Sequence, residues 1–202
     1  PKRLSNFSGK AMKKIAKKEI GKLLATWQKD FDIFVPSGER EEMAGWNGKD
    51  TDFLEHYRNT VIPPKASFLP GMEKLFGFRK EADGYKLDMP RAVERKSLLF
   101  AVRPCDARAL AIIDMVFKDG YEDNYYLNRR QNTLLVGLVC NNPYDSCFCT
   151  SLGFGGPADS SNVDLMLTDT GEYFVIAEIT GKGRELLAKA PGLAEATADD
   201  EA

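Results

Sequence analysis

Four cysteines are the residues of this chain whose type and spacing are best suited to chemistry. Cys140, Cys147 and Cys149 lie within ten residues, and Cys105 precedes them by a longer stretch. In proteins, thiolates in sets of four hold zinc or an iron–sulfur cluster. The chain contains one histidine, His56, so a metal site with several histidine ligands is not expected. We therefore interpret the four thiols as candidate ligands of one metal centre, and favour an iron–sulfur cluster.

A strand–helix–strand unit is the structure expected to bring these cysteines together. Continuous apolar runs at 97–102 and 133–139 predict two buried strands, with a helix between them at 107–118. Strands joined in this way run parallel, and neighbouring strands lie about 5 Å apart. Cys105 and Cys140 follow the carboxyl ends of the two strands, where α/β sheets usually place their sites. A short loop then suffices to bring the other two cysteines to the same end.

Two charged residues flank Cys105 in the predicted turn. Arg103 comes before it, and a guanidinium there would help to offset the negative charge of a cluster held by thiolates. Asp106 comes after it and is expected to cap the helix that begins at Ala107. We count Arg103 and Asp106 as candidates for contact with the bound cofactor, behind the cysteine ligands.

The spacing of the cysteines alone leaves three interpretations open. One remote cysteine is followed by a C-x6-C-x-C pattern, which is neither the usual ferredoxin spacing nor the paired C-x2-C of a zinc ribbon. A metal centre, isolated or structural thiols, and a redox disulfide are each compatible with it. The start of the chain carries no apolar stretch typical of a secretory signal, and a cytoplasmic setting favours metal or redox chemistry over structural disulfides.

The whole chain is expected to adopt an α/β fold. Its mixed sheet is built around the βαβ unit, with an N-terminal helix and a C-terminal β-hairpin. The elements predicted outside the unit are a helix at 8–29, a strand at 31–35 ended by Pro36, hairpins at 78–89 and 163–179, and a short helix at 183–190.

A single α/β iron–sulfur-binding domain is expected over residues 1–190. Within it, residues 1–60 form the N-terminal helix and an irregular part, and residues 61–182 form the core. Residues 191–202 are poor in large apolar side chains and are expected to be an acidic, flexible tail.

Composition excludes several classes of function. Of 202 residues, 43% are hydrophobic and 29% are charged, which is ordinary for a globular protein. The net charge of −2 gives no bulk affinity for nucleic acid, and no run approaches the roughly 20 apolar residues of a membrane helix. No G-x-G-x-x-G follows a predicted strand, so a flavin or dinucleotide at the glycine-rich loop 153–156 is not expected.

Three stretches resemble one protein family. SLLFAVRPCDARALA (97–111), NTLLVGLVCNNPYDSCFC (132–149) and VDLMLTDTG (163–171) are similar to the N-terminal domain of sulfhydrogenase-type beta subunits and of related iron–sulfur proteins. Those proteins accompany hydrogenases, anaerobic sulfite reductases and heterodisulfide-reductase-like complexes. The resemblance spans about residues 62–182. Family members usually continue into a ferredoxin-like segment with two cubane motifs, which this chain does not contain.

The resemblance implies an iron–sulfur electron-transfer component of an anaerobic redox complex. A 4Fe–4S cluster held by Cys105, Cys140, Cys147 and Cys149 would relay electrons between a flavin- or NAD(P)-linked partner and a catalytic hydrogenase or reductase subunit. The chain would then be a non-catalytic part of an oxidoreductase in the cytoplasm, without a membrane span and without nucleic acid. The alternative is a non-redox interaction module, in which the cysteine loop holds a structural zinc ion or no metal.

Overall fold

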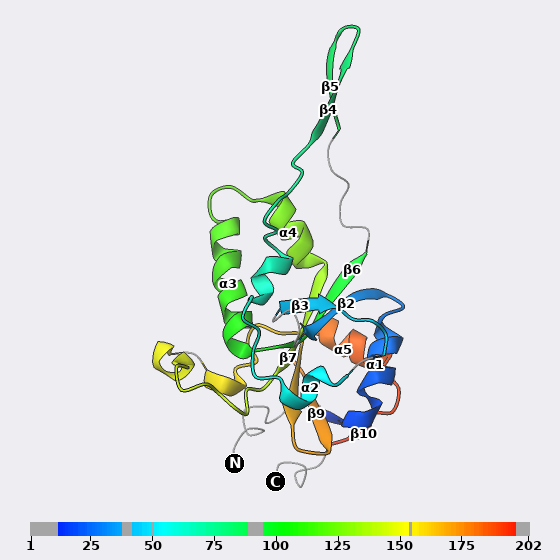
Figure 1. Cartoon of the computed structure of the whole chain (residues 1–202), viewed down its shortest axis with the longest axis vertical. Coiled ribbons are helices and arrows are strands. Elements are labelled where there is room, and N and C mark those ends of the chain that lie inside the picture. The colour runs from blue at the N-terminus through cyan, green and yellow to red at the C-terminus, as the bar shows by residue number, and fades with distance from the viewer. Residues whose placement is uncertain (1–11, 38–41, 50, 89–94, 154, 197–202) are drawn as a thin grey trace.

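An eight-stranded sheet organises the molecule (Figure 1). The structure, a computed structural model, describes residues 12–37, 42–49, 51–88, 95–153 and 155–196. The strand order is β10-β1-β9-β8-β7-β6-β2-β3. The strands of this sheet are β1 (Met12–Ala16), β2 (Phe31–Ser37), β3 (Glu42–Gly45), β6 (Lys96–Val102), β7 (Thr133–Leu138), β8 (Leu165–Asp169), β9 (Tyr173–Glu178) and β10 (Ala194–Glu195).

The centre of the sheet is parallel and its flanks are antiparallel. Strands β2, β6, β7 and β8 pair in parallel, and β8, β9, β1 and β10 pair antiparallel on one side. Strand β3 closes the other side, antiparallel to β2. The mixed sheet, the parallel β6–β7 pair and the C-terminal hairpin of β8 and β9 are therefore confirmed.

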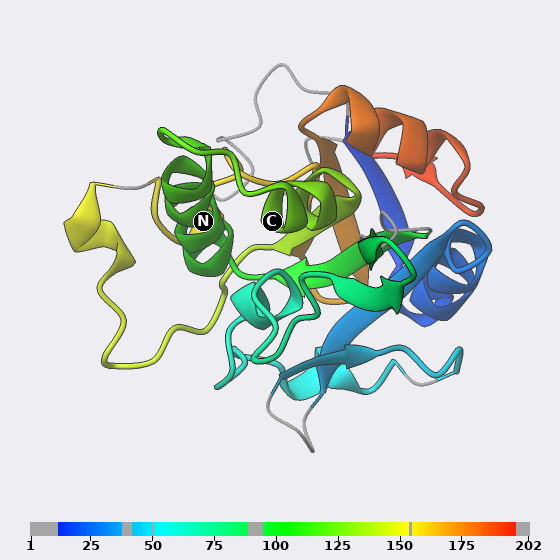
Figure 2. The ribbon, with the colours of Figure 1, turned by 90° about the horizontal axis from the view of Figure 1, so that it is seen from above.

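Helices cover both faces of the sheet, as Figure 2 shows from above. The helices are α1 (Ile20–Trp27), α2 (Phe53–His56), α3 (Pro104–Lys118), α4 (Asn124–Gln131) and α5 (Gly181–Ala188). One core lies between the sheet and helices α1 and α5, and the other lies between the sheet and helices α3 and α4. Strand β6 serves both cores because its side chains alternate: Leu98 and Phe100 enter the first core, and Leu99 enters the second.

The hairpin of β4 (Gly77–Glu81) and β5 (Gly84–Asp88) stands apart from the main sheet. Figure 1 shows it extending along the long axis, away from the helices and the sheet. Every residue of β5 is exposed, and so are the residues of β4 that follow Gly77. The hairpin predicted around Asp83-Gly84 is thus confirmed, and it forms a two-stranded sheet of its own.

The predicted N-terminal helix is wrong over its first half. Residues 8–11 lie outside the described residues, and Met12–Ala16 forms strand β1, which pairs with β9 and β10. A 3-10 turn, Lys17–Glu19, leads from that strand into α1. Met12–Ala16 forms a strand and not a helix because its backbone pairs with β9 and Ile15 is buried there.

Other boundaries also differ from the expectations. Strand β2 continues through Pro36 to Ser37, and helix α4 fills part of the stretch expected to be a connection. Asp106 does not cap α3, because that helix begins at Pro104 and Arg103 is its N-cap. Of the predicted tail, Ala194 and Glu195 form β10, and residues 197–202 lie outside the described residues. In the described ranges, none of the helices is long and apolar enough to cross a bilayer.

Candidate metal centre

A β-bulge at the end of β6 sets the direction of the turn that carries Cys105. The pairing register between β6 and β7 shifts between Phe100 and Val102. Ala101, the residue between them, has φ 66°, a left-handed conformation that non-glycine residues rarely adopt. Phe100 and Ala101 consequently face the same core, and Val102 faces the helix α3 side. The bulge therefore resets the alternation just before Arg103.

Cys105 lies in the first turn of α3, directly after this bulged strand. Pro104 occupies the first turn as well, where its missing N–H costs nothing and its fixed φ suits a helix. Cys105 is exposed. Its position at the carboxyl end of β6 is the one that the sequence predicted.

Cys140 follows β7 at the same end of the sheet. The N–H of Val139 donates to the carbonyl oxygen of Leu167, and the N–H of Cys140 donates to that of Pro157, at 2.8 and 2.9 Å. The strand end is thus held between β8 and the turn Gly156–Ala158. Cys140 itself is half-buried.

Arg103 connects the surroundings of the two cysteines. It is buried, with 5% of its surface exposed. Its Nη1 donates to the carbonyl oxygens of Val139 and Leu138, at 2.8 and 3.3 Å, directly before Cys140. Its Nε and Nη2 donate to the carbonyl oxygens of Arg58 and Tyr57, both at 2.6 Å. The guanidinium also lies 4.3 Å from the ring centroid of Tyr57.

The positive charge of Arg103 is bound by backbone carbonyls. Among the described residues, no carboxylate forms an ion pair with it. A buried charge is costly unless it is compensated. The Asp106 carboxyl lies within electrostatic range of Arg103, and further negative charge nearby would stabilise the guanidinium. Thiolates at Cys105 and Cys140 would provide such a counter-charge.

Burial controls the ionisation of the groups around Cys105. Although Cys105 as a residue is exposed, partial burial of its thiol, reinforced by the charge of Asp106, raises the pKa of that thiol to about 11. The charge of Cys140 acts on the Cys105 thiol in the same direction. Burial also raises the pKa of Asp106 to about 6, against the opposing charge of Arg103. A metal bound at Cys105 would therefore have to displace a proton.

Cys147 and Cys149 lie in the long connection between β7 and β8. Figure 2 shows this connection, in yellow, swinging outward from the sheet. The N–H of Tyr144 donates to the sulfur of Cys147 at 3.3 Å, and the N–H of Cys147 donates back to the carbonyl oxygen of Tyr144 at 3.0 Å. Cys149 begins a 3-10 turn that ends at Leu152.

The base of this connection is anchored by Arg58. Its guanidinium stacks on the Tyr144 ring, 3.9 Å from the centroid, and donates to the carbonyl oxygens of Asn142 and Pro143. Because Arg103 also binds the backbone of Arg58, the two arginines link the cysteine loop to the ends of β6 and β7.

The structure places Cys105 and Cys140 just past the carboxyl ends of the neighbouring parallel strands β6 and β7, but it does not gather all four cysteines. Within the described ranges, no group of three or more histidine, cysteine, aspartate or glutamate side chains is arranged to hold a metal ion. The four-cysteine ligand set, with Arg103 and Asp106 behind it, therefore stays a prediction.

The residues beside Cys105 and Cys140 suit a sulfur-ligated cluster in part. Three buried polar atoms there, Tyr57 Oη, Asp106 Oδ2 and Asn141 Oδ1, have no hydrogen-bond partner in the described part of the chain. The buried cation of Arg103 and the Tyr57 hydroxyl donor fit a negatively charged cluster, whereas the Asp106 and Asn141 oxygens are acceptors and do not bind its sulfurs. Sequence reasoning assigned no role to Tyr57, which stands outside the quoted motifs, or to Asn141, which lies within the 132–149 stretch directly after Cys140.

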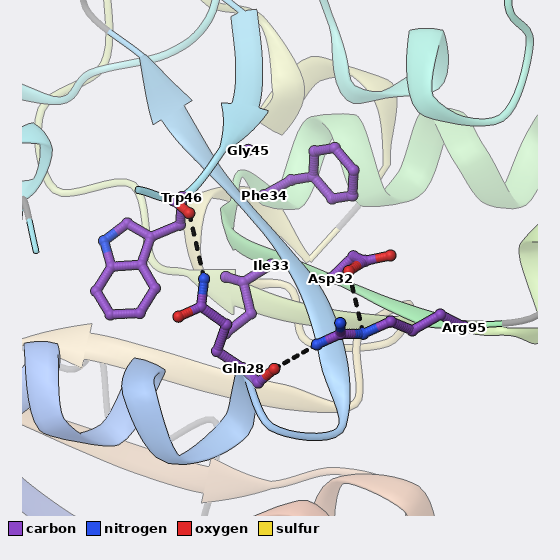
Figure 3. A pocket seen from close by; sticks show the side chains of 7 residues that line it. All are labelled: Gln28, Asp32, Ile33, Phe34, Gly45, Trp46 and Arg95. Atoms are coloured by element: carbon purple, nitrogen blue, oxygen red, sulfur yellow. Dashed lines mark hydrogen bonds and ion pairs between the residues drawn. The ribbon is translucent and has the colours of Figure 1, made fainter. Parts of the chain in front are cut away.

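A separate pocket of about 570 Å³ lies at the other end of β6 (Figure 3). Its polar side chains are already engaged with one another. The Arg95 guanidinium pairs with Asp32 and donates to the carbonyl oxygen of Gln28, and the Gln28 side chain donates to the carbonyl oxygen of Trp46. We assign no ligand to this pocket.

A comparison with curated proteins finds a relative of this chain. No family model matches the chain, and no solved structure matches it. Sulfhydrogenase 2 subunit beta of Pyrococcus furiosus is 31% identical over 135 residues, which cover 65% of this chain and 37% of that protein. The chain thus spans little more than a third of the relative's length. The resemblance to sulfhydrogenase-type beta subunits, predicted from the motifs, is confirmed: this chain is similar to sulfhydrogenase 2 subunit beta.

Proposed function

We propose that this chain is an iron–sulfur electron-transfer module of an anaerobic redox complex of the hydrogenase, sulfhydrogenase or heterodisulfide-reductase-like type. It would work in the cytoplasm, between a flavin- or NAD(P)-linked partner and a catalytic subunit. The observation that carries the proposal is the position of Cys105 and Cys140 just past the carboxyl ends of the neighbouring strands β6 and β7, beside the buried Arg103. The similarity to sulfhydrogenase 2 subunit beta supports it.

In this proposal each residue has a defined task. Cys105, Cys140, Cys147 and Cys149 hold a 4Fe–4S cluster, which when bound takes up and passes on one electron at a time. Arg103 supplies a fixed positive charge near two of the ligands, and Asp106 lies on the same turn. Cys147 is exposed, so a partner subunit could bring its own redox centre close to this side of the site.

Iron and acid-labile sulfide, measured on protein purified without oxygen, are the first test. About four iron and four sulfide per chain, with a brown colour that dithionite bleaches, are expected for the cluster. One zinc ion in a colourless protein would instead establish the structural interaction module. Protein that takes up no metal even on reconstitution would overturn the proposal.

Substitution in the cysteine loop tests the ligand set itself. Cys147→Ser is expected to lose most of the iron and the visible absorbance, because serine is a poor ligand for this soft metal centre. Ser146→Ala is the matched control in the same exposed loop and is expected to keep both. Retention of full iron and colour by Cys147→Ser would remove Cys147 from the ligand set.

A further inference from the structure

The projecting β4–β5 hairpin has an apolar face. Phe78 and Leu87 are paired directly across the two strands, and Lys80 is paired with Tyr85. Because paired residues and residues two apart along a strand share a face, these four side chains lie on the same side of the hairpin. The rings of Phe78 and Tyr85 meet edge to face there, with 6.0 Å between their centroids. The three apolar side chains of this face are all exposed.

The opposite face of the hairpin carries charges that pair with one another. Nε of Arg79 lies 3.5 Å from Oε1 of Glu81, and its Nη2 lies 3.4 Å from Oδ1 of Asp88. Lys86 is paired across the strands with Arg79 and therefore belongs to this face as well. Charged side chains of both signs suit contact with water, so the apolar face is the side that gains from being covered.

The segment that leads into the hairpin is anchored on helix α4. Arg129 donates to the carbonyl oxygen of Phe68 at 2.9 Å and pairs with the carboxylate of Glu73. The hydroxyl of Tyr125 donates to the carbonyl oxygen of Leu75, two residues before β4 begins. The chain is thus fixed to the body almost up to the hairpin, which extends from there along the long axis (Figure 1). A surface held in this way loses less conformational freedom on binding than one on a free loop.

Exposed apolar side chains continue from the hairpin into this segment. Leu69, Met72, Leu75 and Phe76 are exposed as well. Residues 69–88 match in length the lower end of the roughly 20–30 residues that one side of a stable protein–protein interface uses. Exposed apolar side chains gathered in this way mark a site of contact with another protein.

Charge decides between a second copy of this chain and a different protein as the occupant. Lys80 is the charged member of the apolar face, and the residues that share the face are Phe78, Tyr85 and Leu87. In a symmetric dimer the second copy would offer this same face, so two lysines and no carboxylate from it would enter the interface. Like charges placed together in an interface are costly. A different protein, with apolar side chains and a carboxylate opposite Lys80, avoids that cost.

We propose that the apolar face of the β4–β5 hairpin docks a partner subunit whose binding surface is apolar and carries an aspartate or glutamate that pairs with Lys80. The inference rests on the proposed function only for the existence of a partner subunit, and it uses none of the cysteines. In the chain the hairpin precedes the start of β6, whereas Cys105 follows the end of that strand. The docked subunit therefore contacts a part of the molecule other than the cysteine loop.

Carbodiimide coupling tests the ion pair directly, because this reagent joins an amine to a carboxylate in contact with it. The full chain, carrying an affinity tag, is produced in its own organism, purified without oxygen together with its complex, coupled, digested and analysed by mass spectrometry. The expected product joins Lys80 to an aspartate or glutamate of another subunit. A link from Lys80 to a second copy of this chain, or no intermolecular link from Lys80, would overturn the inference.

Substitutions on the two faces then measure docking of the crosslinked subunit by calorimetric titration. Tyr85→Ala and Lys80→Glu are each expected to raise the dissociation constant about 30-fold, the effect of losing an interface hot spot. Lys86→Glu is the matched control, since it makes the same change of charge on the opposite face, and is expected to change the constant by less than about twofold. Equal effects of Lys80→Glu and Lys86→Glu would show that net charge, and not the apolar face, governs binding.

Lys80→Glu leaves the contact between Phe78 and Tyr85 in place, so it tests docking even where Tyr85→Ala disturbs the hairpin. Iron content separates this inference from the proposed function. Parent protein without iron that still forms the Lys80 link would overturn the proposed function and leave the docking surface standing. Parent protein with about four iron per chain but without the link would do the reverse.

Discussion

Tyr126 shows how one buried hydroxyl contributes to the stability of the α3–α4 layer. The residue is 1% exposed, and its ring stacks on Phe117 at 4.4 Å between centroids. Its hydroxyl donates to Asp114 Oδ1 at 2.6 Å, while Asp114 Oδ2 accepts from Arg130 at 3.1 Å. Burial, helped by the bond to the Asp114 carboxylate, raises the pKa of Tyr126 above its ordinary value of 10.

We expect Tyr126→Phe to lower the free energy of unfolding at pH 7 by about 1–2 kcal/mol, because a hydrogen bond to a charged group is lost. A raised folded-state pKa adds stability that is complete below pH 10 and is lost as the pH rises towards the folded-state pKa. The variant should therefore lose less stability than the parent between pH 9 and about pH 11.

Guanidinium unfolding at both pH values measures the two effects. Tyr121→Phe serves as the control, because Tyr121 is 83% exposed and its substitution should change neither value. The same alkaline loss in the parent and in Tyr126→Phe would show that this hydroxyl does not titrate differently on folding.

Helix α5 depends on the close approach of its first turn to Asp164. A Cβ on Gly183 would lie 2.0 Å from the carbonyl oxygen of Asp164. That peptide cannot move easily, because the same oxygen accepts from the N–H groups of Ile179 and Thr180, and the Asp164 carboxylate accepts from the Leu135 N–H at 2.9 Å and from the Thr180 hydroxyl at 2.6 Å.

Gly183→Ala is therefore expected to lower the free energy of unfolding by about 3 kcal/mol, the upper part of the range for overpacking. Gly181→Ala, two residues earlier in the same helix, meets nothing within 4 Å and should change it by less than about 1 kcal/mol. Thermal or urea unfolding compares the two. Equal values for both alanine variants would contradict the close contact.

The strand–helix–strand core was predictable because its signals are local. The continuous apolar runs of β6 and β7 mark buried strands, and Asp83-Gly84 and Asp169-Thr170-Gly171 mark the two hairpins. The same logic placed Cys105 and Cys140 at one end of the sheet. The start of α3 was missed although Pro104 signals a first helical turn.

The elements and contacts that the sequence did not predict depend on residues far apart in the chain. Met12–Ala16 carries apolar residues that also fit a helix, and only pairing with β9 makes it a strand. Helix α4 is strongly polar, so its apolar period is weak, and the side chain of Asp123 capping the N–H of Tyr126 is its clearest signal. Tyr57 stacks on Arg103, a contact between residues 46 positions apart that no spacing rule contains.

The whole molecule consists of a packed body and the projecting β4–β5 hairpin (Figure 1). Phe78, Tyr85 and Leu87 of the hairpin are 67%, 69% and 60% exposed, although Phe78 and Leu87 are paired across the strands. Because an isolated two-stranded hairpin is at best marginally stable, it should contribute little to the stability of the body.

Replacing residues 77–88 with a short Gly-Ser linker is expected to change the free energy of unfolding by no more than about 1 kcal/mol. Phe68→Ala truncates a fully buried side chain and is expected to lower the free energy of unfolding by about 3–5 kcal/mol. It is the reference against which the linker variant is compared. Urea unfolding monitored by far-ultraviolet circular dichroism measures both. A loss from the linker variant as large as that from Phe68→Ala would show that the hairpin packs on the body in solution.

The placement of β1 between β9 and β10 determines when β1 can join the sheet during synthesis of the chain. Met12 pairs with Ala177, and at about 5–20 residues per second the roughly 160 residues between them take about 8–30 s to synthesise. During that time the β2–β6–β7 region can already form, whereas β1 has no strand beside it. The earliest described segment to be translated is thus among the last to join the sheet, and one flank of the sheet stays incomplete until the C-terminal hairpin has emerged.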